Sequence, residues 1–204
     1  MNMQKKEDER INILTLGNSA VGKTSFMIRY TEDNFREVYL SSIGMDYKSK
    51  KVTLPNNKTY RIELYDTAGQ EKYRAISLNL VKYAEGIILM YDITSRDSFE
   101  SISGWIESIK DVKSDNFPII LVGNKCDLED RRKVSLKEGE NLANQFGMKF
   151  FETSNKDGLN IDKVCLELIK QILEQRENGI EGDYAKLKLD RNKKLKKKNC
   201  CERK

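Results

Sequence analysis

Several residue types are rare or missing in this sequence of 204 residues, which has no histidine, two prolines and one tryptophan. Without histidine, no Ser-His-Asp triad can form. The four cysteines, at positions 126, 165, 200 and 201, lack the C-x-x-C spacing that is typical of structural zinc sites. These absences argue against a His-dependent hydrolase and against a fold that zinc stabilises.

Long hydrophobic runs are also missing. Runs such as 86–91 and 119–123 have the length of buried strands and are far shorter than a membrane span. The first ten residues are polar and charged and contain no apolar core, so we expect no secretory signal. The sequence therefore predicts a cytosolic protein.

Positive charge is concentrated at one end of the chain. The formal net charge is +5, but residues 186–204 contain ten Lys or Arg and two acidic residues, a local +8, which leaves −3 for the remainder. The basic character therefore belongs to the tail. We expect no nucleic-acid partner for the folded part.

The length predicts one α/β domain of about 170 residues with a remainder too short for a second. We expect a flexible N-terminus over 1–8, the domain over 9–175, and a basic linker and tail over 176–204. Strand-like runs at 46–54 and 59–65 flank the polar turn Pro55-Asn56-Asn57-Lys58, which predicts an antiparallel hairpin.

Further strand runs at 11–16, 86–92, 118–123 and 149–153 alternate with helical patterns. This order predicts a mostly parallel six-stranded sheet with one antiparallel strand and with helices on both faces. Ser135 and Glu138 have the spacing of a capping box, which marks the start of one helix. In the last helix Cys165 lies on an apolar stripe, so we interpret it as a core residue.

The stretch from Gly17 to Thr24 reads Gly, four residues, Gly-Lys-Thr, between a strand-like and a helix-like run. This context is typical of a phosphate-binding loop, in which backbone N–H groups and a helix N-terminus surround a polyphosphate. Lys23 would reach the β- and γ-phosphates, and the Thr24 hydroxyl would take one Mg²⁺ position. The alternative is an ordinary glycine turn. The residues that we expect to contact nucleotide here are Ser19, Ala20, Val21, Gly22, Lys23, Thr24 and Ser25.

A second motif, Asn124-Lys125-Cys126-Asp127, directly follows a predicted buried strand. The Asp127 carboxylate can accept hydrogen bonds from the N1–H and 2-amino groups of guanine, whereas adenine offers neither donor there. Asn124 would tie this loop to the phosphate loop, and the stem of Lys125 would pack on the purine. The motif therefore predicts a guanine nucleotide.

A third motif begins at Asp66, at the end of the predicted strand 59–65. A carboxylate in this position suits a water-mediated contact with Mg²⁺. Gly69 can bring its N–H close to a γ-phosphate, and Gln70 can orient an attacking water. Taken alone, the segment could equally be a tight turn without function.

Together these motifs resemble the Ras superfamily of small GTPases, which have a P-loop NTPase small G domain, and most of all its Rab branch. Residues 41–47 resemble the first Rab switch and the signature after it, and 88–94 resemble a further Rab segment. The resemblance implies that Phe35 stacks on guanine, Tyr39 closes over the phosphates and Ser42 ligates Mg²⁺. Residues 152–156 are similar to the last guanine motif, which implies guanine contacts from Ser154, Asn155 and Lys156.

Some positions depart from the Rab pattern. Ser42 stands where the family usually has Thr, and it lacks the γ-methyl that stiffens χ1. We hypothesise a less firmly closed first switch; the alternative is that Ser and Thr are equivalent here. Asn155 replaces the usual Ala, but the expected contact uses its backbone N–H, so guanine specificity should survive. The Rab pattern would also place a Trp near Tyr65 and an aromatic residue near Leu80, and this chain departs from it at both places. The sequence therefore leaves the Rab subfamily and the effector open.

The resemblance implies a GTP/GDP switch that hydrolyses GTP slowly with Gln70 and Lys23, recruits effectors through its switch regions and regulates vesicle traffic. Because no arginine is placed to reach the γ-phosphate in cis, a GTPase-activating protein would supply one. A guanine nucleotide exchange factor and a GDP-dissociation inhibitor or escort protein are further implied partners of a monomeric G domain. The alternatives are a non-cycling scaffold, a metabolic P-loop kinase and a Ras-superfamily GTPase outside the Rab branch.

The C-terminus carries Cys200 and Cys201 after the polybasic run 191–198. Paired cysteines of this kind are similar to Rab tails that receive two geranylgeranyl groups, which with the basic run would give stable anchoring. The implied location is the cytoplasmic face of an intracellular membrane, with cycling through the cytosol. The alternative is a solvated basic tail or a nucleic-acid arm.

Overall fold

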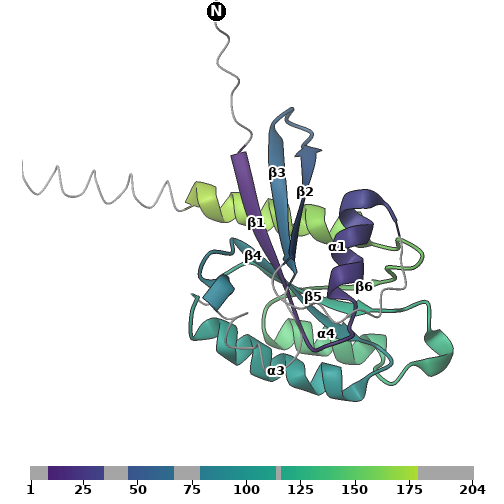
Figure 1. The fold of residues 1–204 in the computed structure, drawn as a ribbon. Coiled ribbons are helices and arrows are strands. Elements are labelled where there is room, and N and C mark those ends of the chain that lie inside the picture. Colours follow the sequence, from purple (N-terminus) through teal and green to yellow (C-terminus); the bar gives the residue numbers. More distant parts are fainter. Residues whose placement is uncertain (1–8, 35–45, 67–78, 114–115, 179–204) are drawn as a thin grey trace, which may run out of the picture. The chain divides into compact units, whose positions relative to one another are not determined.

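A computed structural model describes residues 9–34, 46–66, 79–113 and 116–178 of the protein. Its centre is a six-stranded sheet with the order β2-β3-β1-β4-β5-β6 (Figure 1). β2 is antiparallel to β3, and all other neighbouring strands are parallel, which confirms the predicted sheet. The strands are β1 (Glu9–Leu16), β2 (Asp46–Thr53), β3 (Thr59–Asp66), β4 (Gly86–Asp92), β5 (Ile119–Asn124) and β6 (Lys149–Thr153).

The hairpin of β2 and β3 closes through the predicted polar turn. The Asn56 side chain accepts a hydrogen bond from the backbone N–H of Lys58 at 3.1 Å. Asn57 adopts a left-handed backbone with φ +59°, a conformation that asparagine tolerates better than most residues. The turn chemistry therefore fixes the register, in which Thr53 pairs with Thr59 and Asp46 with Asp66.

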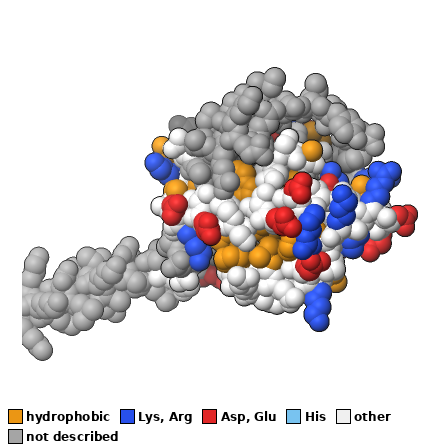
Figure 2. Space-filling view, turned by 90° about the horizontal axis from the view of Figure 1, so that it is seen from below, with side chains coloured by type: hydrophobic (Ala, Val, Ile, Leu, Met, Phe, Trp, Pro, Cys, Tyr) orange, Lys and Arg blue, Asp and Glu red, His pale blue; other side chains and the backbone are white. Residues whose placement is uncertain are grey.

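Helices cover both faces of the sheet. They are α1 (Lys23–Glu32), α3 (Arg96–Lys110), α4 (Leu136–Gln145) and residues 161–169 of a last helix that continues to 178, with a short 3₁₀ turn at Glu129–Arg131. α3 and α4 pack on one face, against Ile87, Leu89 and Tyr91 of β4, and α1 lies on the other (Figure 1). Figure 2 views the side of α3 and α4, where acidic and basic side chains are mixed and hydrophobic ones lie between them.

Side-chain caps fix where two of these helices begin. The Ser95 hydroxyl accepts from Ser98 N–H at the start of α3. At the start of α4, Ser135 and Glu138 form the predicted capping box, each side chain accepting the other's backbone N–H. Hydrogen bonds, first from Arg96 and then from Ser135, lower the pKa of Glu138 to about 2.

The predicted apolar stripe of the last helix is buried at Ile161, Val164, Cys165 and Leu168. Burial raises the pKa of the Cys165 thiol well above its ordinary value, which agrees with its interpretation as a core residue. Among the residues that the structure describes, no helix has both the length and the apolar character needed to cross a bilayer.

The three sequence motifs meet at one edge of the sheet. β1 and β5 run parallel to β4, and β3 runs parallel to β1, so their carboxyl ends point the same way. The loop after β1, the end of β3 at Asp66 and the loop after β5 therefore share this edge, where open α/β sheets bind their ligands.

Candidate functional site

The loop between β1 and α1 has a backbone that few side chains would permit. Gly17 has φ +137°, and a Cβ built on it would lie 2.1 Å from the carbonyl oxygen of Met90 on β4. Gly22 has φ +101° and Ala20 has φ +62°. The glycines of the motif are therefore required by backbone conformation and by the close approach of β4.

Lys23 is held inside this loop. Its side chain is almost fully buried, and its amine donates to the carbonyl oxygens of Gly17 at 3.1 Å and Asn18 at 2.8 Å. Burial lowers the pKa of Lys23 to about 8, and the nearby Asp66 carboxylate opposes that shift in part. A buried cation beside the loop N–H groups suits an anionic ligand such as a phosphate.

Thr24 and Asp66 present oxygen atoms at the start of α1 and the end of β3. The Thr24 hydroxyl donates to Asp66 Oδ2 at 2.5 Å, and Asp66 is completely buried. Within the described ranges, no three His, Cys, Asp or Glu side chains gather into a metal cluster. One hydroxyl and one carboxylate fit Mg²⁺, which prefers oxygen ligands and is usually held by one or two carboxylates together with substrate phosphates.

Asn124 joins the loop after β5 to the phosphate loop. Its side-chain amide donates to the Val21 carbonyl at 2.8 Å, and its Oδ1 accepts from the Thr153 hydroxyl at 3.1 Å. Both hydrogen bonds are buried, so they hold their geometry without competition from water. The tie predicted for Asn124 is thus present in the structure.

The neighbouring residues of this loop are oriented by partners outside it. Lys125 has φ +66°, and its amine lies 2.6 Å from Asp92 Oδ2 at the end of β4. Asp127 Oδ1 accepts from the Ser154 hydroxyl at 2.8 Å, which leaves its second oxygen for a ligand. Burial, together with the charges of Glu152 and Asp127, raises the pKa of the Cys126 thiol.

The loop after β6 also reaches the phosphate loop. The Asn155 side-chain amide donates to the Gly22 carbonyl at 2.9 Å, and Arg29 of α1 donates to the backbone carbonyls of Asn155 and Lys156. The sequence analysis assigned only the backbone N–H of Asn155. Asn155 stands where the Rab pattern has Ala, and this departure was the sequence signal that could have indicated a role for its side chain.

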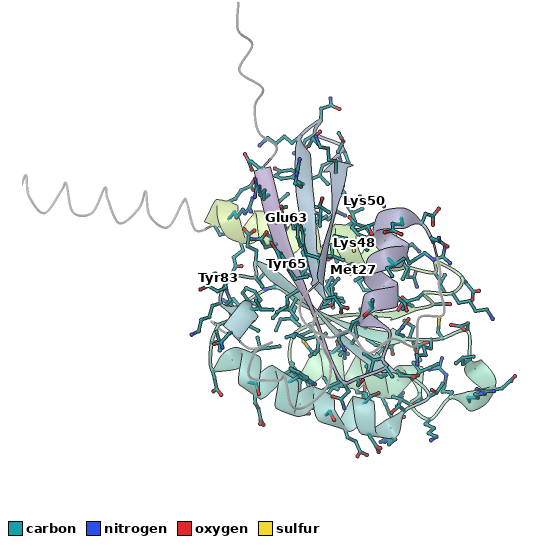
Figure 3. All side chains as sticks on the ribbon, in the orientation of Figure 1. Met27, Lys48, Lys50, Glu63, Tyr65 and Tyr83 are labelled. Atoms are coloured by element: carbon teal, nitrogen blue, oxygen red, sulfur yellow. The ribbon has the colours of Figure 1, made fainter. Side chains whose placement is uncertain are left out.

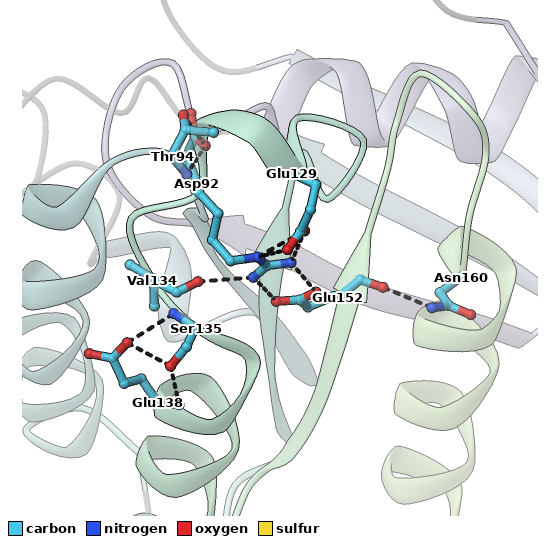
Figure 4. Close-up of polar contacts among 9 residues, drawn as sticks. Asp92, Thr94, Glu129, Val134, Ser135, Glu138, Glu152 and Asn160 are labelled. Carbon is cyan, nitrogen blue, oxygen red and sulfur yellow. Dashed lines mark hydrogen bonds and ion pairs between the residues drawn. The ribbon is translucent and has the colours of Figure 1, made fainter.

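A half-buried arginine, Arg132, which the sequence analysis missed, supports the end of β6. The Arg132 guanidinium bonds both oxygens of Glu152, at 2.6 and 2.9 Å, and also bonds Glu129 and the Val134 carbonyl (Figure 4). Asn160 donates to the Glu152 carbonyl at 2.8 Å. Hydrogen bonds to the two glutamates raise the pKa of Arg132 above its ordinary value. This network fixes the strand end from which the loop 154–157 starts.

Asn18 connects the phosphate loop to α3, which the sequence analysis also missed. Its side chain accepts from the Trp105 indole N–H at 3.0 Å and donates to the Ser101 hydroxyl at 2.9 Å. The only tryptophan of the sequence therefore contributes to the position of the loop as well as to the core.

The structure brings four predicted segments to the same edge of the sheet. They contain Ser19, Ala20, Val21, Gly22, Lys23, Thr24, Ser25, Asp66, Asn124, Lys125, Asp127, Ser154, Asn155 and Lys156. The other predicted site residues, Phe35, Tyr39, Ser42, Gly69, Gln70, Cys200 and Cys201, lie outside the described residues.

Comparison with known proteins identifies the family. The family model described as "Ras family" matches residues 12–174. The chain belongs to the Ras family. It is 42% identical over 189 residues to "Ras-related protein Rab-3C" of Bos taurus, covering 93% of this chain and 83% of the relative. It is also 42% identical over 176 residues to "Ras-related protein Rab-3" of Caenorhabditis elegans, covering 86% of this chain and 80% of the relative.

These relatives place the protein in the Rab branch of the Ras family. It is a small GTPase, a switch of vesicle traffic that binds guanine nucleotides and hydrolyses GTP. The predicted recognition and fold are thereby confirmed.

Proposed function

We propose that GTP and GDP bind at the edge formed by the phosphate loop and the loops after β5 and β6. The observation that carries this proposal is the buried hydrogen bond from Asn124 to Val21, which joins the two loops. The backbone from Ser19 to Ser25 surrounds the phosphates and Lys23 neutralises them. Asp127 accepts from the guanine edge, Lys125 packs on the purine, and the loop from Ser154 to Lys156 completes the base site.

Mg²⁺ is the cofactor of this site. Thr24 and Asp66 would hold it together with Ser42, and when bound it would neutralise charge on the β- and γ-phosphates. The pairing of the Thr24 hydroxyl with a buried carboxylate supports this assignment, since both are hard oxygen donors. Phe35, Tyr39 and Gly69 are the further nucleotide contacts that we propose.

Hydrolysis depends on few groups of the chain itself. Gln70 orients the attacking water and Lys23 stabilises the charge that develops on the phosphates. A GTPase-activating protein accelerates this slow step, and an exchange factor replaces GDP by GTP. Effectors bind the switch regions of the GTP state, and a GDP-dissociation inhibitor or escort protein carries the GDP state.

The G domain covers residues 9–175, and residues 176–204 form the anchoring tail. Geranylgeranyl groups on Cys200 and Cys201, together with the basic run, hold the protein on the cytoplasmic face of an intracellular membrane. Tagged wild type should therefore locate to membranes, and a Cys200→Ser, Cys201→Ser double variant should be diffuse. A diffuse wild type would contradict the anchor.

The base assignment is tested by exchanging one atom of the Asp127 carboxylate. Because Ser154 donates to one oxygen of Asp127, Asp127→Asn can keep that bond and present its N–H₂ to the base. Guanine, which offers donors there, should then be rejected. Xanthine, which has a carbonyl oxygen in place of the 2-amino group, should be accepted.

Asp130→Asn, the same change at an exposed position of the neighbouring turn, is the matched control. Competition between GDP and xanthosine diphosphate for a fluorescent nucleotide measures the preference of each variant. We expect a reversal only for Asp127→Asn, of about 10⁴-fold or more in the ratio of affinities. An unchanged preference for GDP would remove Asp127 from the base site.

A further inference from the structure

Asn155 forms a second link between the base loop and the phosphate loop. Its side chain is 4% exposed, and its Nδ2 donates to the Gly22 carbonyl at 2.9 Å. Asn124 donates to the adjacent carbonyl of Val21 at 2.8 Å. Two amides, from the ends of two neighbouring strands, therefore bond successive carbonyls of the same loop.

Gly22 is fitted closely to these two amides. A Cβ built on Gly22 would lie 2.3 Å from the Asn124 amide nitrogen and 2.8 Å from that of Asn155. The Gly22 carbonyl also accepts the N–H of Phe26 at 2.8 Å, which is the first hydrogen bond of α1. The Asn155 amide thus bonds the residue at which the phosphate loop becomes a helix.

The same helix holds the base loop at a second point. Arg29, two turns further along α1, donates from Nε to the Asn155 carbonyl at 2.7 Å and from Nη2 to the Lys156 carbonyl. The loop after β6 is therefore attached to α1 at Gly22 through a side chain and at Arg29 through its backbone. Only the first attachment depends on the identity of residue 155.

We propose that Asn155 is a positioning residue that slows the release of guanine nucleotide by keeping the phosphate loop and the base loop together. This inference rests on the nucleotide site proposed above. A nucleotide that contacts both loops can leave only when they separate or shift, and such a movement must break the bond between Asn155 and Gly22. An alanine at position 155 could not form this bond, so the slow release that we propose depends on the identity of residue 155.

Loss of one such hydrogen bond should speed GDP release about fivefold, which corresponds to about 1 kcal/mol. Two variants separate the hydrogen bond from packing. Asn155→Ala removes the whole amide, whereas Asn155→Leu keeps a similar branched shape without a donor. Asn141→Ala, on the exposed surface of α4, is the matched control because it makes the same exchange away from the loops.

The experiment measures release of fluorescent GDP from the full-length protein with excess unlabelled GDP, and affinities for GDP and GMP by competition. We expect both Asn155 variants to release GDP faster than wild type and than Asn141→Ala. GMP lacks the β-phosphate, so it depends less on the joining of the loops and should lose less affinity than GDP. Melting temperatures with saturating GDP check that the variants are folded.

Each outcome decides one point. A wild type that binds neither GDP nor GTP would overturn the proposed nucleotide site itself. If wild type binds GDP but both Asn155 variants release it at the wild-type rate, the nucleotide site stands and the positioning role fails. A wild-type rate for Asn155→Leu alone would assign the effect to packing, and equal losses of GDP and GMP affinity would indicate a damaged base loop; either result refutes the proposal.

Discussion

Lys23 should lower the free energy of unfolding of the nucleotide-free protein, although it strengthens the binding of nucleotide. Its side chain is 5% exposed, and burial lowers its pKa from 10.5 to about 8. In the unfolded chain the amine keeps its ordinary pKa. Between about pH 8 and 10.5 the unfolded chain therefore holds a proton that the folded protein has released, so the free energy of unfolding rises with pH.

The size of this effect follows from the two pKa values. A difference of one pKa unit corresponds to about 1.36 kcal/mol. The shift of the Lys23 pKa from 10.5 to about 8 therefore lowers the free energy of unfolding by roughly 3 kcal/mol, and this loss of stability is complete below pH 8. Lys23→Met removes the buried charge but also the bonds to the Gly17 and Asn18 carbonyls, which contribute roughly 1 kcal/mol each. The variant should therefore be more stable than wild type by about 1 kcal/mol at pH 7.

Urea unfolding of the nucleotide-free proteins at pH 7 and pH 10 measures the difference. Wild type should be less stable than Lys23→Met at pH 7 and more stable at pH 10, because only wild type gains stability as the buried amine loses its proton. Lys137→Met, the same exchange on the exposed surface of α4, should follow wild type.

Nucleotide binding should show the opposite dependence on Lys23. A phosphate beside the amine favours its charged form, so wild type should take up a proton on binding GDP between about pH 8 and 10 and bind more weakly as pH rises. Calorimetry in buffers of different ionisation enthalpy detects that proton. Parallel stability profiles for wild type and Lys23→Met between pH 7 and 10 would refute the reasoning.

Three further substitutions test other parts of the molecule. Tyr91→Phe removes a fully buried hydroxyl with no hydrogen-bond partner in the described part of the chain, so thermal unfolding should show stability unchanged or higher by about 1 kcal/mol; a clear loss would reveal a partner. Asp92→Asn keeps the acceptor for the Thr94 N–H but loses the ion pair with Lys125. Fluorescent GDP should therefore be released about fivefold faster from this variant. An unchanged release rate would show that other contacts hold Lys125. Gln70→Leu should remove much of the stimulation by an activating protein, which is about 10³- to 10⁵-fold in such systems, without affecting GTP binding; single-turnover hydrolysis measures it, and full stimulation would exclude Gln70 from the reaction.

Local sequence chemistry was sufficient to predict most of the fold. Two signals act within a few residues of the chain: the turn from Pro55 to Lys58 and the capping box at Ser135. The alternation of strands with helices follows from the periodicity of successive short segments. The observed strand boundaries differ slightly from the predicted ones: β1 begins at Glu9 and β5 ends at Asn124. Strand ends depend on pairing with neighbouring strands, and the periodicity of one segment carries no information on that pairing.

The motifs predicted which loops form the site, but not how the loops are held. Arg132 reaches Glu152 across 20 residues, and Asn155 reaches Gly22 across 133. Neither spacing is periodic, and an arginine in a loop or an asparagine after a strand usually faces solvent. Such contacts depend on which strand ends become neighbours, so they follow from the topology of the sheet and not from local sequence.

The position of β2 at the edge of the sheet has a consequence for solubility. Within the described residues no strand pairs with its outer side, and an open edge can pair with another chain. β2 carries Lys48, Lys50 and Lys51; Lys48 and Lys50 lie on the side of α1, where they contact Glu32 and the Tyr30 carbonyl (Figure 3). Pairing of two such edges would bring the lysines of both strands close together, and like charges on facing strands repel each other. The lysines of β2 should therefore disfavour pairing of this edge with a strand of another molecule.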